Sequence, residues 1–362
     1  MFDKVDFLYK NSSYKSTTFL KHKGVIIMKK AVFAVLVLLV FLAFSSGIAD
    51  AKMIVKYGHV GPPIHPQHHA AVAFAKYVTE KTNGEIEVQV FPLGQLGGER
   101  SMTEQVQGGT LQMTAVTAGV LANFVPEVGI IELPFVYPNR DVAYKVLDDK
   151  EVRERFAKYC DGKGFVFIGY TENEFRDMTN SKRPIKKPED LKGLKIRVVE
   201  APMMIDTFKA LGANPTPMPF PEIYNALQQK VIDGQDNPIY TSILMKFTEV
   251  NKFATITNHI LTECPTVVNK AFWNSLTPAQ QKIFRDAAEV QLKVNRDGNT
   301  KNRAEALDKA KAQKVDVHIL TDQERAAFKI AVQPVLDKYR AQYGAEWFDF
   351  YLKKIDFYGK KK

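Results

Sequence analysis

The sequence predicts an α/β fold with two lobes and a ligand cleft between them, and three observations support this prediction. A strand, a helix and a second strand follow one another at residues 53–58, 67–82 and 85–91, which is the order of a β-α-β unit. A second series of strands and helices begins near residue 172, and the segment from Thr277 to Tyr343 has a mostly helical pattern. A chain of 362 residues, 45% of them hydrophobic, is long enough for two cores.

The first 51 residues have the pattern of an exported protein. The apolar run Ala31–Phe44 follows Met28-Lys29-Lys30 and precedes Ala49-Asp50-Ala51. At 14 residues it is shorter than the roughly 20 that a bilayer-spanning helix needs. A cleavable signal peptide over residues 28–51 is therefore favoured over an uncleaved anchor. Residues 1–27 are then an upstream extension, and the mature protein is expected in the periplasm.

The net charge of the mature chain is modest. The full chain carries +10, but without residues 1–51 it has 43 basic and 37 acidic residues, a net charge of +6. The basic residues are spread out and form no block with interleaved aromatics, so the sequence predicts no nucleic-acid partner. A mildly basic exported protein suits small anionic ligands.

The other elements follow from periodicity and turn residues. Asn83-Gly84 turns the first helix into the second strand, in which Ile86, Val88 and Val90 share one face. Thr277-Pro278 is an N-cap with proline in the first helical turn. The β-α-β unit favours a parallel sheet. Further elements are expected at residues 99–107, 113–118, 165–170, 195–199, 202–211 and 222–230, with a polar surface loop at 180–188.

Patterns typical of catalysis, metals and cofactors are missing from the sequence. It contains no G-x-S-x-G or H-E-x-x-H, and Gly94–Gly98 lacks the spacing of a dinucleotide site. Prolines at 62, 63 and 66 keep His65 outside any helix, so it either lines the cleft or lies in a solvated loop. Cys160 and Cys264 form either a disulfide or two buried thiols. We therefore expect no enzyme, no metal and no cofactor.

Two arginines are the candidate functional residues. Arg197 lies among apolar residues in K-I-R-V-V, and Arg176 lies 21 residues earlier, after a buried strand. A guanidinium in an apolar strand needs a partner, because its desolvation costs several kcal/mol. From the residues alone, three interpretations stay open: an internal salt bridge with Glu200 or Asp236, a side chain at the strand edge that snorkels to solvent, or a bidentate clamp for a ligand carboxylate.

Five segments in order resemble the solute-binding proteins of tripartite ATP-independent periplasmic (TRAP) transporters, in the dicarboxylate-binding branch. They are F-P-L-G-Q-L-G-G-E-R (91–100), F-R-D-M-T-N-S-K-R-P-I (175–185), D-L-K-G-L-K-I-R-V (190–198), L-G-A-N-P-T-P-M-P-F-P-E-I-Y-N-A-L-Q-Q (211–229) and V-I-D-G-Q-D-N-P (231–238). The resemblance covers residues 52–350. Two positions depart from it, because Glu174 and Lys230 stand where the family usually has glycine.

The resemblance implies a set of ligand-binding residues. Arg197 would hold the ligand carboxylate and Arg176 would contact the same end. Phe220 would pack over the ligand, Asn237 would contact the carboxylate, and Glu99 would accept bonds from ligand hydroxyls. The resemblance also suggests His65, Tyr240 and the segment Leu261–Cys264 as parts of the cleft wall.

The resemblance implies a two-lobed periplasmic binding protein fold with a long C-terminal helix spanning both lobes. Lobe I would comprise residues 52–173 with 263–310 returning to it, lobe II residues 174–262, and residues 311–362 a helical region packed across them. Such a monomer would close on a C4-dicarboxylate or related small carboxylate and deliver it to the TRAP membrane permease subunits. A ligand-sensing component of a signalling system is the alternative.

Overall fold

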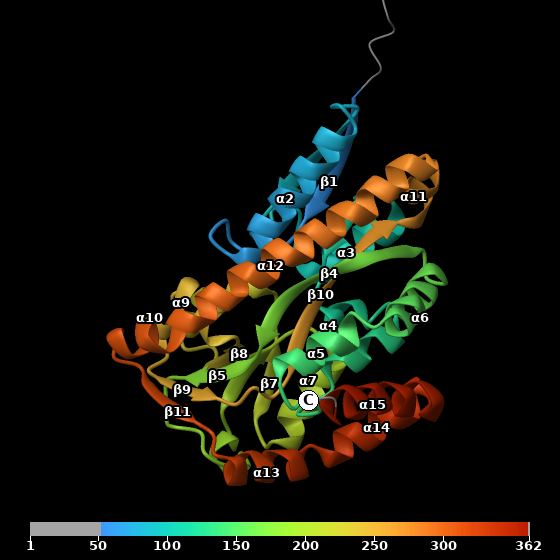
Figure 1. Cartoon of the computed structure of the whole chain (residues 1–362). Coiled ribbons are helices and arrows are strands. Elements are labelled where there is room, and N and C mark those ends of the chain that lie inside the picture. Colours follow the sequence, from blue (N-terminus) through green and yellow to red (C-terminus); the bar gives the residue numbers. More distant parts are fainter. Residues whose placement is uncertain (1–51, 361–362) are drawn as a thin grey trace, which may run out of the picture. The chain divides into compact units, whose positions relative to one another are not determined.

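The computed structural model describes residues 52–360. The predicted upstream extension and signal peptide lie outside these residues. Residues from Lys52 onward form one compact unit with two β-sheets (Figure 1). No helix within residues 52–360 combines the length and apolar character needed to cross a membrane.

The first sheet has five strands in the order β2-β1-β3-β10-β4. Its bounds are β1 Met53–Gly58, β2 Ile86–Phe91, β3 Met113–Ala115, β4 Phe165–Phe175 and β10 Leu261–Asn269. The β-α-β unit is confirmed, because β1 pairs in parallel with β2 and α2 (Pro66–Lys81) lies between them in sequence. The whole sheet is mixed rather than parallel, because β10 runs antiparallel to both β3 and β4.

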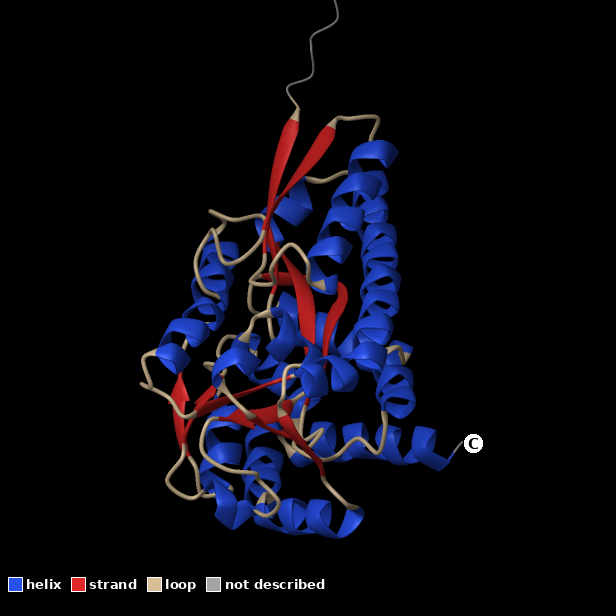
Figure 2. Cartoon of the chain, turned by 90° about the vertical axis from the view of Figure 1, so that its left-hand side faces the viewer, coloured by secondary structure: helices blue, strands red, loops and turns tan. Residues whose placement is uncertain are grey.

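The second sheet has six strands in the order β11-β9-β5-β8-β6-β7. Its bounds are β5 Asp177–Asn180, β6 Lys195–Val198, β7 Asn214–Pro217, β8 Gly234–Asn237, β9 Phe253–Ile256 and β11 Asp316–Ile319. Strand β11 lies in the segment that was expected to be mostly helical, and it pairs in parallel with β9. Figure 2 shows the strands as two separate groups, with helices covering them.

Helices accompany both sheets. Those that follow strands of the first sheet are α3 Glu99–Gly108, α4 Ala118–Leu121, η1 Pro126–Glu132, α5 Arg140–Leu147, α6 Lys150–Asp161 and α11 Lys270–Ser275. Those of the second are η2 Pro188–Leu191, α7 Pro202–Ala210, η3 Phe220–Glu222, α8 Ile223–Gln228, α9 Ile239–Leu244 and α10 Phe247–Val250. The C-terminal helices are α13 Asp322–Ala331, α14 Gln333–Tyr343 and α15 Ala345–Lys360.

Two long strands and one long helix join the sheets. Strand β4 continues to Phe175, so the expected lobe boundary at residues 173 and 174 falls inside it, and β5 begins after Arg176. Strand β10 returns alongside β4, with Leu261 opposite Phe175. Helix α12 (Pro278–Ala312) packs against α2 and β4 at one end and α9 at the other (Figure 1). Its predicted N-cap is confirmed, since Thr277 and Gln280 form a capping box.

The two positions at which the family usually has glycine, Glu174 and Lys230, both have a positive backbone φ angle. Glu174 has φ of +79° and Lys230 has φ of +59°. Glycine adopts this left-handed region without the steric cost that other residues bear. Glu174 lies within β4 and Lys230 follows α8, so this chain adopts the left-handed conformation at both positions with residues other than glycine.

Candidate functional site

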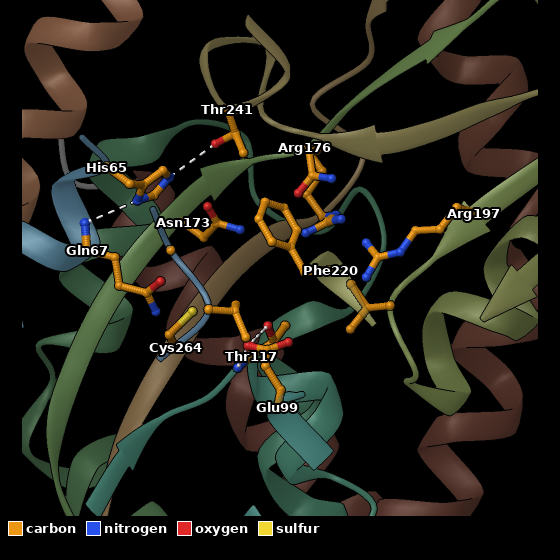
Figure 3. Close-up of a pocket in the computed structure, with 14 residues that line it drawn as sticks. His65, Gln67, Glu99, Thr117, Asn173, Arg176, Arg197, Phe220, Thr241 and Cys264 are labelled. Carbon is orange, nitrogen blue, oxygen red and sulfur yellow. Dashed lines mark hydrogen bonds between the residues drawn. The ribbon is translucent and has the colours of Figure 1, made fainter. Parts of the chain in front are cut away.

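A pocket at the passage between the two sheets brings together residues from both. It encloses about 400 Å³ of atom-free space, its open mouth included. Six of the seven predicted site residues line it: His65, Glu99, Arg176, Arg197, Phe220 and Asn237. Figure 3 shows Arg176 and Arg197 on one side of the pocket and His65 and Gln67 on the other.

Arg197 carries a buried charge that no acidic side chain of the described residues neutralises. It lies in β6 with 2% of its surface exposed. Its Nε and Nη2 donate to the carbonyl oxygen of Met218 at 2.9 and 2.7 Å, and Nη1 has no partner. Burial and then the neighbouring charge of Arg176 lower the pKa of Arg197 to about 10, so it stays protonated at neutral pH. The pocket therefore contains a cation that lacks an anion.

Arg176, in contrast, is already paired. Its Nε donates to Asp236 Oδ2 at 2.6 Å, and Nη2 donates to Oδ1 at 3.1 Å. Nη1 has only a long contact with Thr262 Oγ1, at 3.4 Å. Although burial favours the neutral acid, the charge of Arg176 holds the pKa of Asp236 below its ordinary value. Asp236, one of the two acidic partners open to Arg197 from the sequence, is thus paired with Arg176 instead.

His259 makes a second hydrogen bond to the carboxylate of Asp236. Its Nε2 lies 3.4 Å from Asp236 Oδ2, and its Nδ1 lies 2.7 Å from Thr257 Oγ1. Burial lowers the pKa of His259, so the neutral ring is favoured, and the network assigns the proton to Nε2. Asp236 therefore receives bonds from both Arg176 and His259.

Glu99 begins α3 and places a carboxyl group at the pocket floor. Its Oε1 accepts bonds from Thr117 N at 2.9 Å and Thr117 Oγ1 at 2.6 Å (Figure 3). Burial raises the pKa of Glu99, while the bonds from Thr117 and the charges of Arg197 and Arg176 oppose this. Glu99 can accept a bond from a ligand hydroxyl.

Glu132, in η1, is completely buried, and no side chain donates a hydrogen bond to either of its carboxyl oxygens. Burial raises the pKa of Glu132 to about 8, so it holds its proton at neutral pH. It adds almost no charge to this region.

The far side of the pocket is polar but uncharged. His65 caps α2, with Nδ1 accepting from Gln67 N at 3.1 Å, so its Nε2 is the donor toward Thr241 Oγ1 at 3.2 Å. Burial lowers the pKa of His65 to about 3, and the ring is neutral. Tyr240 does not line the pocket. Its ring packs 5.5 Å from that of His65, its hydroxyl donates to Asn299 Oδ1 at 2.9 Å, and Thr241 takes the lining position.

Phe220 and Asn237 complete the predicted set. Phe220 begins η3 and lies half-buried, with its ring edge-on to Phe247 at 6.1 Å. Asn237 ends β8, and its amide donates to Gln235 Oε1. Both come from the second sheet or its connections, opposite residues such as Glu99 from the first.

Cys264, from the suggested wall segment Leu261–Cys264, also lines the pocket. Four polar lining residues were not among the predicted site residues: Gln67, Thr117, Asn173 and Thr241. Each of these four lies within three residues of an end of a predicted element or of a predicted site residue, but these residue types are too common in loops to be singled out. Cys160 and Cys264 are both buried and unpaired, so no disulfide joins them. Within residues 52–360, no three His, Cys, Asp or Glu side chains are arranged to hold a metal ion.

Two sheets joined by crossing strands, with a charged pocket at the crossing, define a solute-binding protein. Residues 57–342 match the bacterial extracellular solute-binding proteins, family 7. The chain belongs to this family, whose members are the solute-binding proteins of TRAP transporters and are not enzymes. Its members bind small acids and work with membrane permease components.

Individual relatives bind different acids. A 2,3-diketo-L-gulonate-binding periplasmic protein of Escherichia coli (strain K12) is 36% identical over 80% of this chain and 87% of its own length. A C4-dicarboxylate-binding periplasmic protein of Rhodobacter capsulatus is 32% identical over 84% of this chain and 92% of its own length. A TRAP periplasmic solute-binding protein from Polaromonas sp. JS666, solved with bound D-erythronate, is 34% identical. The match covers 83% of this chain and 98% of the other, with a TM-score of 0.79.

Proposed function

We propose that this chain captures a small organic acid in the periplasm and delivers it to a TRAP permease, with Arg197 binding the ligand carboxylate. One observation carries the proposal. Arg197 is a buried, protonated guanidinium that lines the pocket, has an unpartnered Nη1 and forms no ion pair with any described residue. An anionic ligand would supply the missing partner and make a charge-assisted bond.

The other predicted residues would act around this bond. The Nη1 of Arg176 and the amide of Asn237 would contact the same carboxylate, and Phe220 would cover the ligand. Glu99 and the uncharged wall of the pocket that contains His65 would form hydrogen bonds with hydroxyl or keto groups of the ligand. The names of relatives support an acid with such groups, since 2,3-diketo-L-gulonate and D-erythronate carry them.

We further propose how the protein reaches the periplasm and how it closes on its ligand. A signal peptide at residues 28–51 would direct export, and a monomer would close its two lobes on the ligand. Ligand contacts with both lobes would shift the population toward the closed form. That form would be presented to the permease, with no chemical step on the ligand.

Calorimetric titration of the mature protein tests the proposal. A thermal-shift screen against organic acids first finds ligands, because a ligand that binds only the folded state raises the melting temperature. Arg197→Ala should then weaken the best acid by at least about 2 kcal/mol, or roughly 30-fold in Kd.

Arg100→Ala is the matched control, because Arg100 is an exposed arginine of α3 paired with Glu104. It should leave Kd unchanged. Unaltered affinity in Arg197→Ala would refute the assignment of the carboxylate site.

A further inference from the structure

Asp236 lies behind Arg176 and is itself completely buried in β8. Its two carboxylate oxygens face Nε and Nη2 of Arg176 at 2.6 and 3.1 Å. This bidentate match holds Arg176 in one orientation, in which its side chain lines the pocket and its Nη1 has only a long contact with Thr262. The pair as a whole is electrically neutral.

The charges around the pocket can therefore be counted. Its charged lining residues are Arg176, Arg197 and Glu99. Asp236 cancels the charge of Arg176, which leaves Arg197 as the lining cation without a partner among the described residues. Glu99 supplies no positive charge in either of its protonation states.

The wall of the pocket opposite the arginines has no positive charge that could pair with a second carboxylate of the ligand. His65 is buried and bonded to Gln67 and Thr241, and its low pKa keeps the ring neutral. Gln67, Asn173 and Thr241 are uncharged groups that can bond hydroxyls. A second ligand carboxylate would lose its hydration without gaining an ion pair, which is a costly way to bury a charge.

We propose that Asp236 is a specificity-determining residue: by neutralising Arg176, it makes this pocket a site for monoanionic acids with a neutral, hydroxyl-bearing tail and disfavours dicarboxylates. The inference rests on the proposed function, because it takes the ligand carboxylate to lie at Arg197. It narrows that function to one class of acid. Asp236 acts through Arg176 and is not required to touch the ligand.

The test compares acids that share a carbon skeleton and differ by one carboxylate. D-Erythronate pairs with meso-tartrate, and D-galactonate pairs with galactarate. Titration calorimetry near neutral pH gives the ratio of the diacid Kd to the monoacid Kd. In the wild-type protein, the monoacid should bind at least about tenfold more tightly, since an unpaired buried charge costs more than 1.4 kcal/mol.

Asp236→Asn frees the charge of Arg176 while keeping the shape of the side chain. Its diacid-to-monoacid ratio should fall at least about tenfold, because a second carboxylate now finds a cation. The double variant Arg176→Gln/Asp236→Asn removes both charges and should return the ratio to near the wild-type value. A purely structural role for Asp236 would weaken both acids alike and leave the ratio unchanged.

Glu132→Gln is the matched control, because Glu132 is equally buried nearby but is protonated at neutral pH. It should not alter the ratio. The inference is overturned if Asp236→Asn gives the same ratio as Glu132→Gln, or if the wild-type protein binds the diacid as tightly as the monoacid. Should Asp236→Asn not fold, the wild-type ratio still decides whether the pocket prefers the monoacid. Loss of the Arg197→Ala effect would instead refute the proposed function, so the two failures are distinguishable.

Discussion

Replacement of Glu174 should separate two opposing contributions to stability. Its φ of +79° costs a non-glycine residue about 1–2 kcal/mol. Its carboxylate is nearly buried and bonds to Arg140 of α5 and Arg303 of α12, while Oε1 also accepts from Phe175 N at 3.0 Å. The ion pairs offset the backbone strain, which explains why a glutamate is tolerated here.

The two effects can be measured with alanine and glycine at the same position. Glu174→Ala loses the ion pairs and keeps the strain. A fully buried pair would cost 3–5 kcal/mol, but Arg140 and Arg303 keep 18% and 35% of their side-chain surface exposed, so we expect about 2–3 kcal/mol. Glu174→Gly loses the same bonds but relieves the strain, and should be about 1 kcal/mol more stable than Glu174→Ala.

Urea unfolding of the mature protein, followed by circular dichroism, measures both differences. The control is the same pair of substitutions at Glu154, an exposed residue inside α6. There glycine should be less stable than alanine by about 1 kcal/mol, because the helical backbone gives glycine no advantage. If glycine were no more stable than alanine at position 174, backbone strain there would be disproved.

Three further predictions follow from single side chains. Lys230 is exposed with φ of +59°, so Lys230→Gly should stabilise the protein by about 0.5–1 kcal/mol in urea unfolding, whereas a loss would contradict the strain. Burial raises the pKa of Glu132 from 4.5 to about 8, so the folded state holds a proton that the unfolded state releases, and stability should fall by up to about 1.4 kcal/mol per pH unit between these values. Unfolding at several pH values should show a shallower fall in Glu132→Gln, and equal slopes would refute the raised pKa. Arg197→Lys should retain the charge but lose the planar fork, and should weaken acid binding about tenfold in calorimetry, less than Arg197→Ala; equal losses in both would show that charge alone contributes nothing.

Local patterns predicted the elements that depend on neighbouring residues. The bounds of β1 agree with the prediction, those of α2 and β2 differ by one residue, and the capping box at Thr277 is present, because periodicity and capping act within a few residues. The antiparallel course of β10 and the pairing of β11 with β9 were not predicted. Both depend on segments far apart in the chain, so short-range patterns cannot specify them.

The sequence by itself determined that Arg197 is an arginine in an apolar strand, and that such a charge needs a partner. It did not determine which partner, because Asp236 is available to either Arg176 or Arg197 along the chain. Only the tertiary structure decided this, by placing β8 so that Asp236 faces Arg176 at 2.6 Å. Electrostatic pairing depends on distances of a few ångströms between strands brought together by folding. That arrangement leaves Arg197 as the cation available to a ligand.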